Sequence, residues 1–393
     1  MLYIFLTPDV SNMGGAQMYV ENKSAFLRSR GWKTEVFFYS RAEKLILPIL
    51  SESRDNIVPD MAFGYNYVPN FRRRKILKLI QNKCGNEKEI VIESQLVSLS
   101  FWGEAIAKVL GAKHITNFLE ERFVPISKEE AKFLEFKLYN WQFMNAAEKR
   151  LKGVFRNYFK NDYLNFKNDV TYPCSNVLAD SVQTSFSIET ADYTISSVGR
   201  LDKYYVLPMF DEILLFAQKH TDKTINVIIV GGSPDGTVEQ KIKELFKYIY
   251  NVRLYFMGYL FPVPKDLLTK CDVGIASANS VDVTASIGIP TISVDINDSY
   301  AIGIYGYTTQ RRFTRSDEPQ TPISQLLEDV LIKGVVNNLR ASVPDKDSKK
   351  EFEKQLAFLD KSTTDSYYPV ETTMPWLEKK VAQLKWALAS LLS

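Results

Sequence analysis

The chain has 393 residues, of which 45% are hydrophobic and 24% are charged, with 18 glycines and 16 prolines. This composition is typical of a folded protein and excludes a disordered tail, a collagen-like array and a small disulfide scaffold. The length predicts two domains, each with its own core. Cys84, Cys174 and Cys271 lack metal-ligand spacing, so we expect no disulfides, no zinc and a cytoplasmic location. No apolar run reaches 18 residues, and residues 2–6 are too short for a signal peptide.

The formal net charge of +3 is unevenly distributed along the chain. Residues 1–180 carry 26 Lys and Arg against 20 Asp and Glu, a balance of +6, whereas residues 181–393 carry 23 against 26, a balance of −3. The overall balance is far from that of a nucleic-acid-binding protein, so we expect no nucleic-acid partner. A basic first half favours a local anionic partner such as a diphosphate or a membrane surface.

Short apolar runs alternate with helical stretches twice along the chain. In the first half we expect strands at 2–6, 34–39, 89–93 and 114–118, with helices at about 16–30, 72–82 and 98–110. In the second half we expect strands at 193–198, 225–230, 252–257, 271–276 and 291–295, again separated by helices. Continuous β-branched runs separated by helices indicate parallel sheets covered on both faces. The pattern predicts two doubly wound α/β domains, with ligands bound in a cleft at the carboxyl ends of the strands.

Neither the strand-like nor the helical pattern continues between Asn168 and Asp192, and we place the domain boundary there. The predicted domains are 1–175 and 190–365, followed by a final helix at 370–393. Apolar residues recur in that helix at helical spacing and predict a buried stripe: Leu377, Val381, Leu384, Leu388 and Leu391.

Glycines follow several of the predicted strands and precede helices. Gly14 and Gly15 come after the first strand, where glycine lets backbone N–H groups approach an anion, although a simple tight turn is an equal alternative. In the segment SSVGRLDK (196–203), Arg200 and Lys203 are suited to clamp a diphosphate, the alternative being solvated charges. Glycine-rich loops recur at 228–236 and 255–260, and small hydroxyl and amide residues follow the strand near 276.

Taken together and in this order, these motifs resemble the GT-B glycosyltransferases, and among them family 4, which assembles bacterial polysaccharides and glycolipids. The resemblance covers most of the chain and implies two facing Rossmann-like domains, with the final helix crossing back to the first. It implies that the first domain binds the acceptor and the second the nucleotide sugar, with a UDP-sugar as the expected donor and no cofactor. The donor-binding residues it implies are Gly14, Gly15, Arg200, Gly232, Gly258 and Tyr259, and we expect Lys203 to join them because of its charge near Arg200.

The chain departs from the family pattern at three places. Tyr205 occupies the position of a diphosphate-binding lysine, and the paired glutamates that hold the donor sugar and ribose are missing. Asp282 is the only carboxylate between Asp272 and Gly288. We therefore expect Asn279, Ser280 and Asp282 to line the donor pocket, the alternative being that Asn279 and Ser280 cap the following helix.

The third departure is that strand-end glutamates stand where the family has histidines. Glu93, Glu120 and Glu121 are candidate catalytic residues that bind sugar hydroxyls or deprotonate an acceptor hydroxyl, whereas a single glutamate there would only cap a helix. His114 and His220 lie away from the glycine-rich loops and are expected to be structural. The only Asp-x-Asp motif, at 345–347, is expected to be a solvated helix entry, so we predict no metal site.

The resemblance thus implies a retaining glycosyltransferase with a saccharide, lipid-linked or protein acceptor, and we expect it to act without a metal ion. An inverting transferase on the same fold, a nucleotide-sugar epimerase and a non-catalytic partner subunit stay open as alternatives. The segment NFRRRKILKLIQNK (70–83) carries Arg72, Arg73, Arg74 and Lys75 beside apolar residues. It predicts docking on an anionic inner-membrane surface, the alternative being a solvated helix face.

Overall fold

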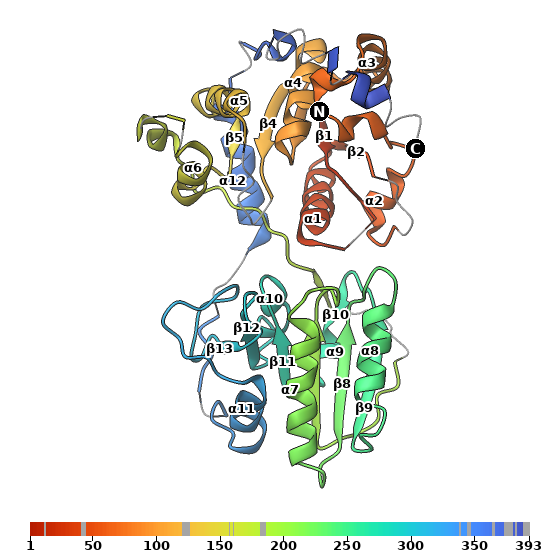
Figure 1. Cartoon of the computed structure of the whole chain (residues 1–393), viewed down its shortest axis with the longest axis vertical. Coiled ribbons are helices and arrows are strands. Elements are labelled where there is room, and N and C mark those ends of the chain that lie inside the picture. Colours follow the sequence, from red (N-terminus) through yellow and green to blue (C-terminus); the bar gives the residue numbers. More distant parts are fainter. Residues whose placement is uncertain are drawn as a thin grey trace. The chain divides into compact units, whose positions relative to one another are not determined.

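The computed structural model describes residues 1–11, 13–40, 45–119, 126–156, 158–159, 161–180, 186–337, 339–343, 347–363, 366–372, 380–381 and 383–387. The chain divides into two compact units. The first comprises Met1–Asn12, Ala16–Pro173 and Asp347–Ser393, and the second comprises Met13–Gly15 and Cys174–Lys346. In each unit helices cover a central sheet (Figure 1).

The first unit contains a parallel five-stranded sheet of order β2-β1-β3-β4-β5. Its strands are β1 (Leu2–Leu6), β2 (Lys33–Phe37), β3 (Ile90–Ser94), β4 (Lys113–Asn117) and β5 (Phe143–Met144). Its helices are α1 (Gly15–Ser29), α2 (Pro48–Glu52), α3 (Asn70–Cys84), α4 (Val97–Leu110), α5 (Lys128–Tyr139), α6 (Glu148–Phe155) and α12 (Ser348–Lys361). Every residue of β1 and β3 is buried, as expected of central parallel strands.

The second unit contains a six-stranded sheet of order β13-β12-β11-β7-β8-β9. Its strands are β7 (Tyr193–Val198), β8 (Ile225–Val230), β9 (Val252–Gly258), β11 (Val273–Ala276), β12 (Thr291–Val294) and β13 (Ala301–Tyr305), of which only β13 pairs antiparallel. Its helices are α7 (Val206–Lys219), α8 (Thr237–Leu245), α9 (Lys265–Leu268), α10 (Ser280–Ala285) and α11 (Ile323–Leu327). The short strands β6 (Leu178–Ala179) and β10 (Val263–Pro264) pair separately. The predicted doubly wound α/β class is confirmed.

The end of the chain differs from the sequence prediction in two ways. Helix α12 falls within 190–365, which we assigned to the second domain, yet it belongs to the first unit. The predicted stripe of the final helix is also wrong where it can be seen, because Val381 is 47% and Leu384 66% exposed. Trp386 is the buried anchor instead, and its indole Nε1 donates to Asp60 Oδ1 at 3.1 Å. Leu377, Leu388 and Leu391 lie outside the described residues.

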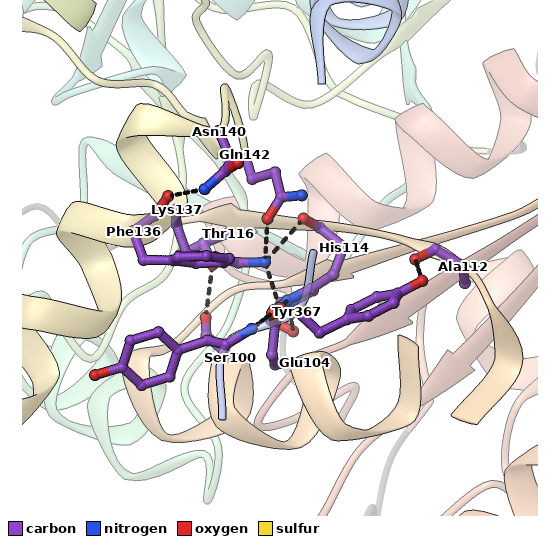
Figure 2. A network of polar contacts seen from close by, with 12 residues as sticks. Ser100, Glu104, Ala112, His114, Thr116, Phe136, Lys137, Asn140, Gln142 and Tyr367 are labelled. Atoms are coloured by element: carbon purple, nitrogen blue, oxygen red, sulfur yellow. Dashed lines mark hydrogen bonds and ion pairs between the residues drawn. The ribbon is translucent and has the colours of Figure 1, made fainter. Parts of the chain in front are cut away.

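A buried ionic cluster joins α4, β4 and α5 in the first unit (Figure 2). His114 Nδ1 lies 2.7 Å from Glu104 Oε2, Lys137 Nζ also contacts that oxygen, and Lys137 donates to Gln142 Oε1 at 2.6 Å. Burial lowers the pKa of His114 to about 4. Burial alone would raise the pKa of Glu104. Charge interactions and hydrogen bonds with Lys137 and His114 outweigh this effect and lower the pKa of Glu104 to about 2. The predicted structural role of His114 is confirmed.

This cluster makes the stability of the protein depend on pH. The unfolded chain binds a proton at His114 near pH 6.5, whereas the folded chain resists it down to about pH 4, so protons favour unfolding across that interval. We expect the unfolding free energy to fall by up to about 3 kcal/mol between pH 6.5 and 4 from this residue. Glu104 extends the loss, because its lowered pKa removes stability between pH 4.5 and 2.

Urea denaturation followed by tryptophan fluorescence across this pH range measures the effect. His114→Gln lacks the titrating group, so its unfolding free energy should decline less steeply than that of the wild type between pH 6.5 and 4. Parallel curves for the two proteins would contradict the assignment.

Candidate functional site

The loops after β7, β8 and β9 meet at the carboxyl end of the second sheet. The Gly231 amide donates to the carbonyl of Gly258 at 2.7 Å, and the Leu201 amide donates to that of Gly232 at 3.0 Å. The amide of Gly199 bonds to the last residue of β8 at 2.9 Å. The structure thus brings together three of the glycine-rich segments that the sequence analysis singled out, where ligands of doubly wound sheets bind.

Glycine is required at the centre of this junction. A Cβ on Gly231 would lie 1.8 Å from the carbonyl oxygen of Gly199, and the residue has φ +137°, which side chains rarely adopt. A Cβ on Gly232 would lie 2.9 Å from the ring of Tyr259, whose hydroxyl donates to the Gly232 carbonyl at 2.6 Å. The predicted residues Gly232, Gly258 and Tyr259 therefore form one packed unit.

Arg200 follows Gly199 and is engaged by a neighbouring carboxylate. Its Nε donates to Asp202 Oδ1 at 2.9 Å, and its terminal nitrogen contacts the other oxygen of Asp202, so the pair is bidentate. The side chains are 31% and 26% exposed. This hydrogen bonding raises the pKa of Arg200, against the opposing effect of burial, and lowers that of Asp202. The sequence pattern does not indicate this partner for Arg200.

A pocket of about 480 Å³ opens between the loop after β7 and the start of α8. Aliphatic, aromatic, hydroxyl and charged side chains line it together: Leu201, Asp202, Lys203, Tyr204, Leu207, Ser233, Pro234, Asp235, Thr237 and Val238. The predicted residue Lys203 is exposed on this wall. The volume of the pocket falls in the range of small-molecule binding sites.

The segment at the start of α10 closes on the same junction. Ser280 Oγ lies 3.3 Å from the position that a Cβ on Gly199 would occupy. Asn279 stands at the N-cap position, but its side chain caps nothing and bonds to Cys174 Sγ and to Arg312 instead. Asp282 forms an ion pair with Arg312. The capping alternative is therefore wrong for Asn279.

Three residues of this region were not recognised from the sequence: Asp202, Glu239 and Arg312. Glu239 of α8 accepts from the amide of Ser233 at 2.8 Å and so holds the loop after Gly232. Arg312 lies in the segment QRRFTR (310–315), a cluster of arginines that was visible in the sequence. Its link to Asp282 was not visible, because the two residues are 30 positions apart.

Glu93, a candidate catalytic residue, is completely buried in the first unit. Lys23 Nζ and the Tyr3 hydroxyl each donate to Glu93 Oε2 at 2.6 Å, and Asn117 Nδ2 donates to Oε1 at 2.9 Å. An unexposed carboxylate with both oxygens engaged does not fit the expected role of an acceptor base. Here Glu93 is the counter-ion of the buried Lys23.

Of the remaining candidates of the first half, the structure describes the two glycines. Gly14 stands in the loop between β1 and α1, and α1 begins at Gly15, as expected for glycines at a strand–helix junction. Glu120 and Glu121 lie outside the described residues. Of the Asp-x-Asp motif, Asp347 caps α12 by accepting from two backbone amides, which fits the expected helix entry.

The described residues contain no group of three His, Cys, Asp or Glu side chains arranged to hold a metal ion. Within the same part of the chain, no helix has both the length and the apolar character needed to cross a bilayer.

Comparison with known proteins relates the whole chain to one fold. Alr3699/HepE from Anabaena, solved in complex with UDP and glucose, superposes with a TM-score of 0.52 at 10% identity, covering 100% of both chains. Sucrose-phosphate synthase from Thermosynechococcus elongatus gives 0.52 at 11% identity, again over 100% of both chains. A glycosyltransferase from Rickettsia africae gives 0.50 at 11% identity over 98% of each.

The chain has the GT-B fold. No protein-family profile and no curated protein sequence matches it, so membership of family 4 stays a prediction. The likeness in fold extends through both units, including the sheet whose carboxyl end carries the site described above.

The glycine junction can be tested by substitution. Gly231→Ala should destabilise the second unit by at least about 3 kcal/mol, because the new Cβ overlaps the Gly199 carbonyl and the backbone conformation is unfavourable for alanine. Gly236→Asn is the matched control, since Gly236 has φ +76° and open space around it, and asparagine tolerates that region. Thermal and urea unfolding measure both variants. Equal stability of Gly231→Ala and the wild type would contradict the required close approach.

Proposed function

We propose that the protein is a glycosyltransferase that uses a nucleoside-diphosphate sugar as donor, with the diphosphate bound in the second unit. The observation that carries this proposal is the convergence of the Gly199, Gly231 and Gly232 backbones beside Arg200 at the carboxyl ends of β7 and β8. The carboxyl ends of parallel strands are where ligands of doubly wound sheets bind, and a guanidinium binds phosphate oxygens bidentately. UDP in the HepE structures supports this class of ligand.

The finer features of the reaction belong to the same proposal. We propose a UDP-sugar as donor, a saccharide, lipid-linked or protein acceptor bound by the first unit, and retention of configuration. Arg200, Lys203 and backbone N–H groups would stabilise the charge of the leaving diphosphate without a metal ion. For the acceptor hydroxyl, Glu120 and Glu121 remain the candidate partners, because Glu93 is buried against Lys23.

A non-catalytic partner subunit is the second candidate. It is favoured by the absence of the paired glutamates and by the ion pair of Asp282, the carboxylate expected in their place, with Arg312. Failure to bind UDP, GDP or dTDP in calorimetric titration would favour this role. A screen of nucleotide sugars for transfer or hydrolysis would identify an active enzyme, and NMR of the product anomer would distinguish retention from inversion.

Arg200→Ala tests the proposed diphosphate site. Loss of a charge-assisted bidentate contact should weaken UDP binding by about 30-fold or more, corresponding to about 2 kcal/mol. Isothermal titration calorimetry measures the dissociation constant, and circular dichroism checks the fold. Arg253→Ala is the matched control, because Arg253 also pairs with an acid, Glu189, but at the opposite end of the sheet. Equal UDP affinity for wild type and Arg200→Ala would remove Arg200 from the site.

We also propose that the protein docks from the cytoplasm on an anionic membrane surface through α3. The expected cluster needs revision, because Arg73 is buried over the ring of Tyr65 and Arg72 forms an ion pair with Asp60. Arg74, Lys75 and Lys78 are exposed, and so are the apolar side chains of Phe71 and Leu79. Exposed cations beside exposed apolar groups complement anionic headgroups and the acyl boundary beneath them.

Liposome sedimentation tests this surface. The wild type should bind phosphatidylserine vesicles at low salt and release them at high salt, and Arg74→Glu/Lys75→Glu should weaken binding by about 30-fold, since each basic residue contributes about 1 kcal/mol. Lys241→Glu/Lys270→Glu reverses two exposed charges of the second unit and serves as the control. Equal sedimentation with neutral and anionic vesicles would contradict docking through α3.

A further inference from the structure

We infer that Asp202 sets the affinity of the diphosphate site by holding the guanidinium of Arg200 until a ligand displaces it. The inference rests on the proposed function and adds a residue that the sequence pattern did not point to. Asp202 contacts two nitrogens of Arg200, which is the fork that a phosphate group would otherwise engage. A carboxylate two residues away thus stands in the place of the ligand.

The pair is built so that it can open. Its members are separated by one residue in the loop after β7, so rotation of two side chains breaks it without moving a helix or a strand. Both side chains are about a quarter to a third exposed, so water screens the ion pair and competes for both groups. The Arg312–Asp282 pair beside it differs in both respects, since it joins distant segments and is only 20% and 11% exposed.

The surroundings favour exchange of the carboxylate for a diphosphate. Asp202 lies on the wall of the pocket next to Lys203, so the released guanidinium and the ammonium can face one ligand together. A diphosphate carries more negative charge than one carboxylate and matches the guanidinium with equal geometry. Hydrogen bonding to Arg200 lowers the pKa of Asp202, so its negative charge persists and opposes ligand binding as long as it stays in place.

Calorimetric titration of UDP into four full-length proteins tests the inference: wild type, Asp202→Asn, Arg200→Ala and the double variant. Asp202→Asn should bind UDP about two- to five-fold more tightly than the wild type, as expected for removing a weak exposed ion pair. The gain in UDP affinity caused by Asp202→Asn should be smaller in the Arg200→Ala background, because the guanidinium that Asp202 binds is then absent. Asp222→Asn removes an exposed carboxylate next to Lys223, at the amino end of β8, and should leave affinity unchanged.

The possible results separate the two proposals. Arg200-dependent UDP binding together with unchanged or weaker binding by Asp202→Asn would overturn the role of Asp202 and leave the proposed function intact. An equal gain in Asp222→Asn would also overturn it, because the effect would then follow net charge alone. Absence of UDP binding in all four proteins would overturn both. Melting temperatures within a degree or two of each other would show that the affinity change is not a loss of structure.

Discussion

The close approach of two loop backbones at the carboxyl ends of β7 and β8 is the constraint on which the second unit's site depends. The space between the Gly199 carbonyl and the Gly231 Cα is too small for any side chain. With the backbones in contact, Tyr259 reaches the Gly232 carbonyl, Ser280 packs against Gly199, and Arg200 follows directly after this contact and pairs with Asp202. Each contact follows from the absence of a few Cβ atoms.

The alternation of apolar runs and helical stretches predicted all but one strand of each of the two large sheets to within a few residues. The same pattern missed the two-residue strand β5 and the antiparallel edge strand β13, because short or irregular segments carry little periodicity. It also misassigned α12, since a helix shows its apolar face in the sequence but not the surface on which that face packs.

The candidate site was only partly accessible to the same reasoning. Glycines at strand ends could be located, because their chemistry is local to the chain. The partners of charged residues could not be located, because they are set by how the folded chain packs. These pairs are Asp202 with Arg200, Arg312 with Asp282 and Lys23 with Glu93. Glu93 follows the pattern of a strand-end carboxylate, yet the fold uses it to neutralise a buried lysine, and isolated buried charge is costly.

A buried hydrogen-bonded group in the first unit has the geometry of a catalytic site. Ser94 Oγ lies 3.0 Å from His114 Nε2, and His114 Nδ1 lies 2.7 Å from Glu104, the arrangement of a hydrolytic triad. All three residues are at most 1% exposed, and Gly103 lies directly against the serine and the histidine. Access of a substrate distinguishes an active centre from an internal brace, and here the arrangement fastens α4 to the sheet.

The chain returns to the first unit at Asp347, and this return affects the order in which the two units fold during synthesis. Gln355 of α12 accepts from the Tyr19 hydroxyl at 3.0 Å and donates to the Thr171 carbonyl at 2.7 Å, so both ends of the first unit meet at one buried amide. A ribosome delivers residues 174–346 before it delivers Gln355. Domains generally fold in the order of their synthesis, the amino-terminal one first. Here the first unit cannot complete its fold until the second unit has been synthesised. The second unit can finish folding while Tyr19 still lacks its contact with Gln355.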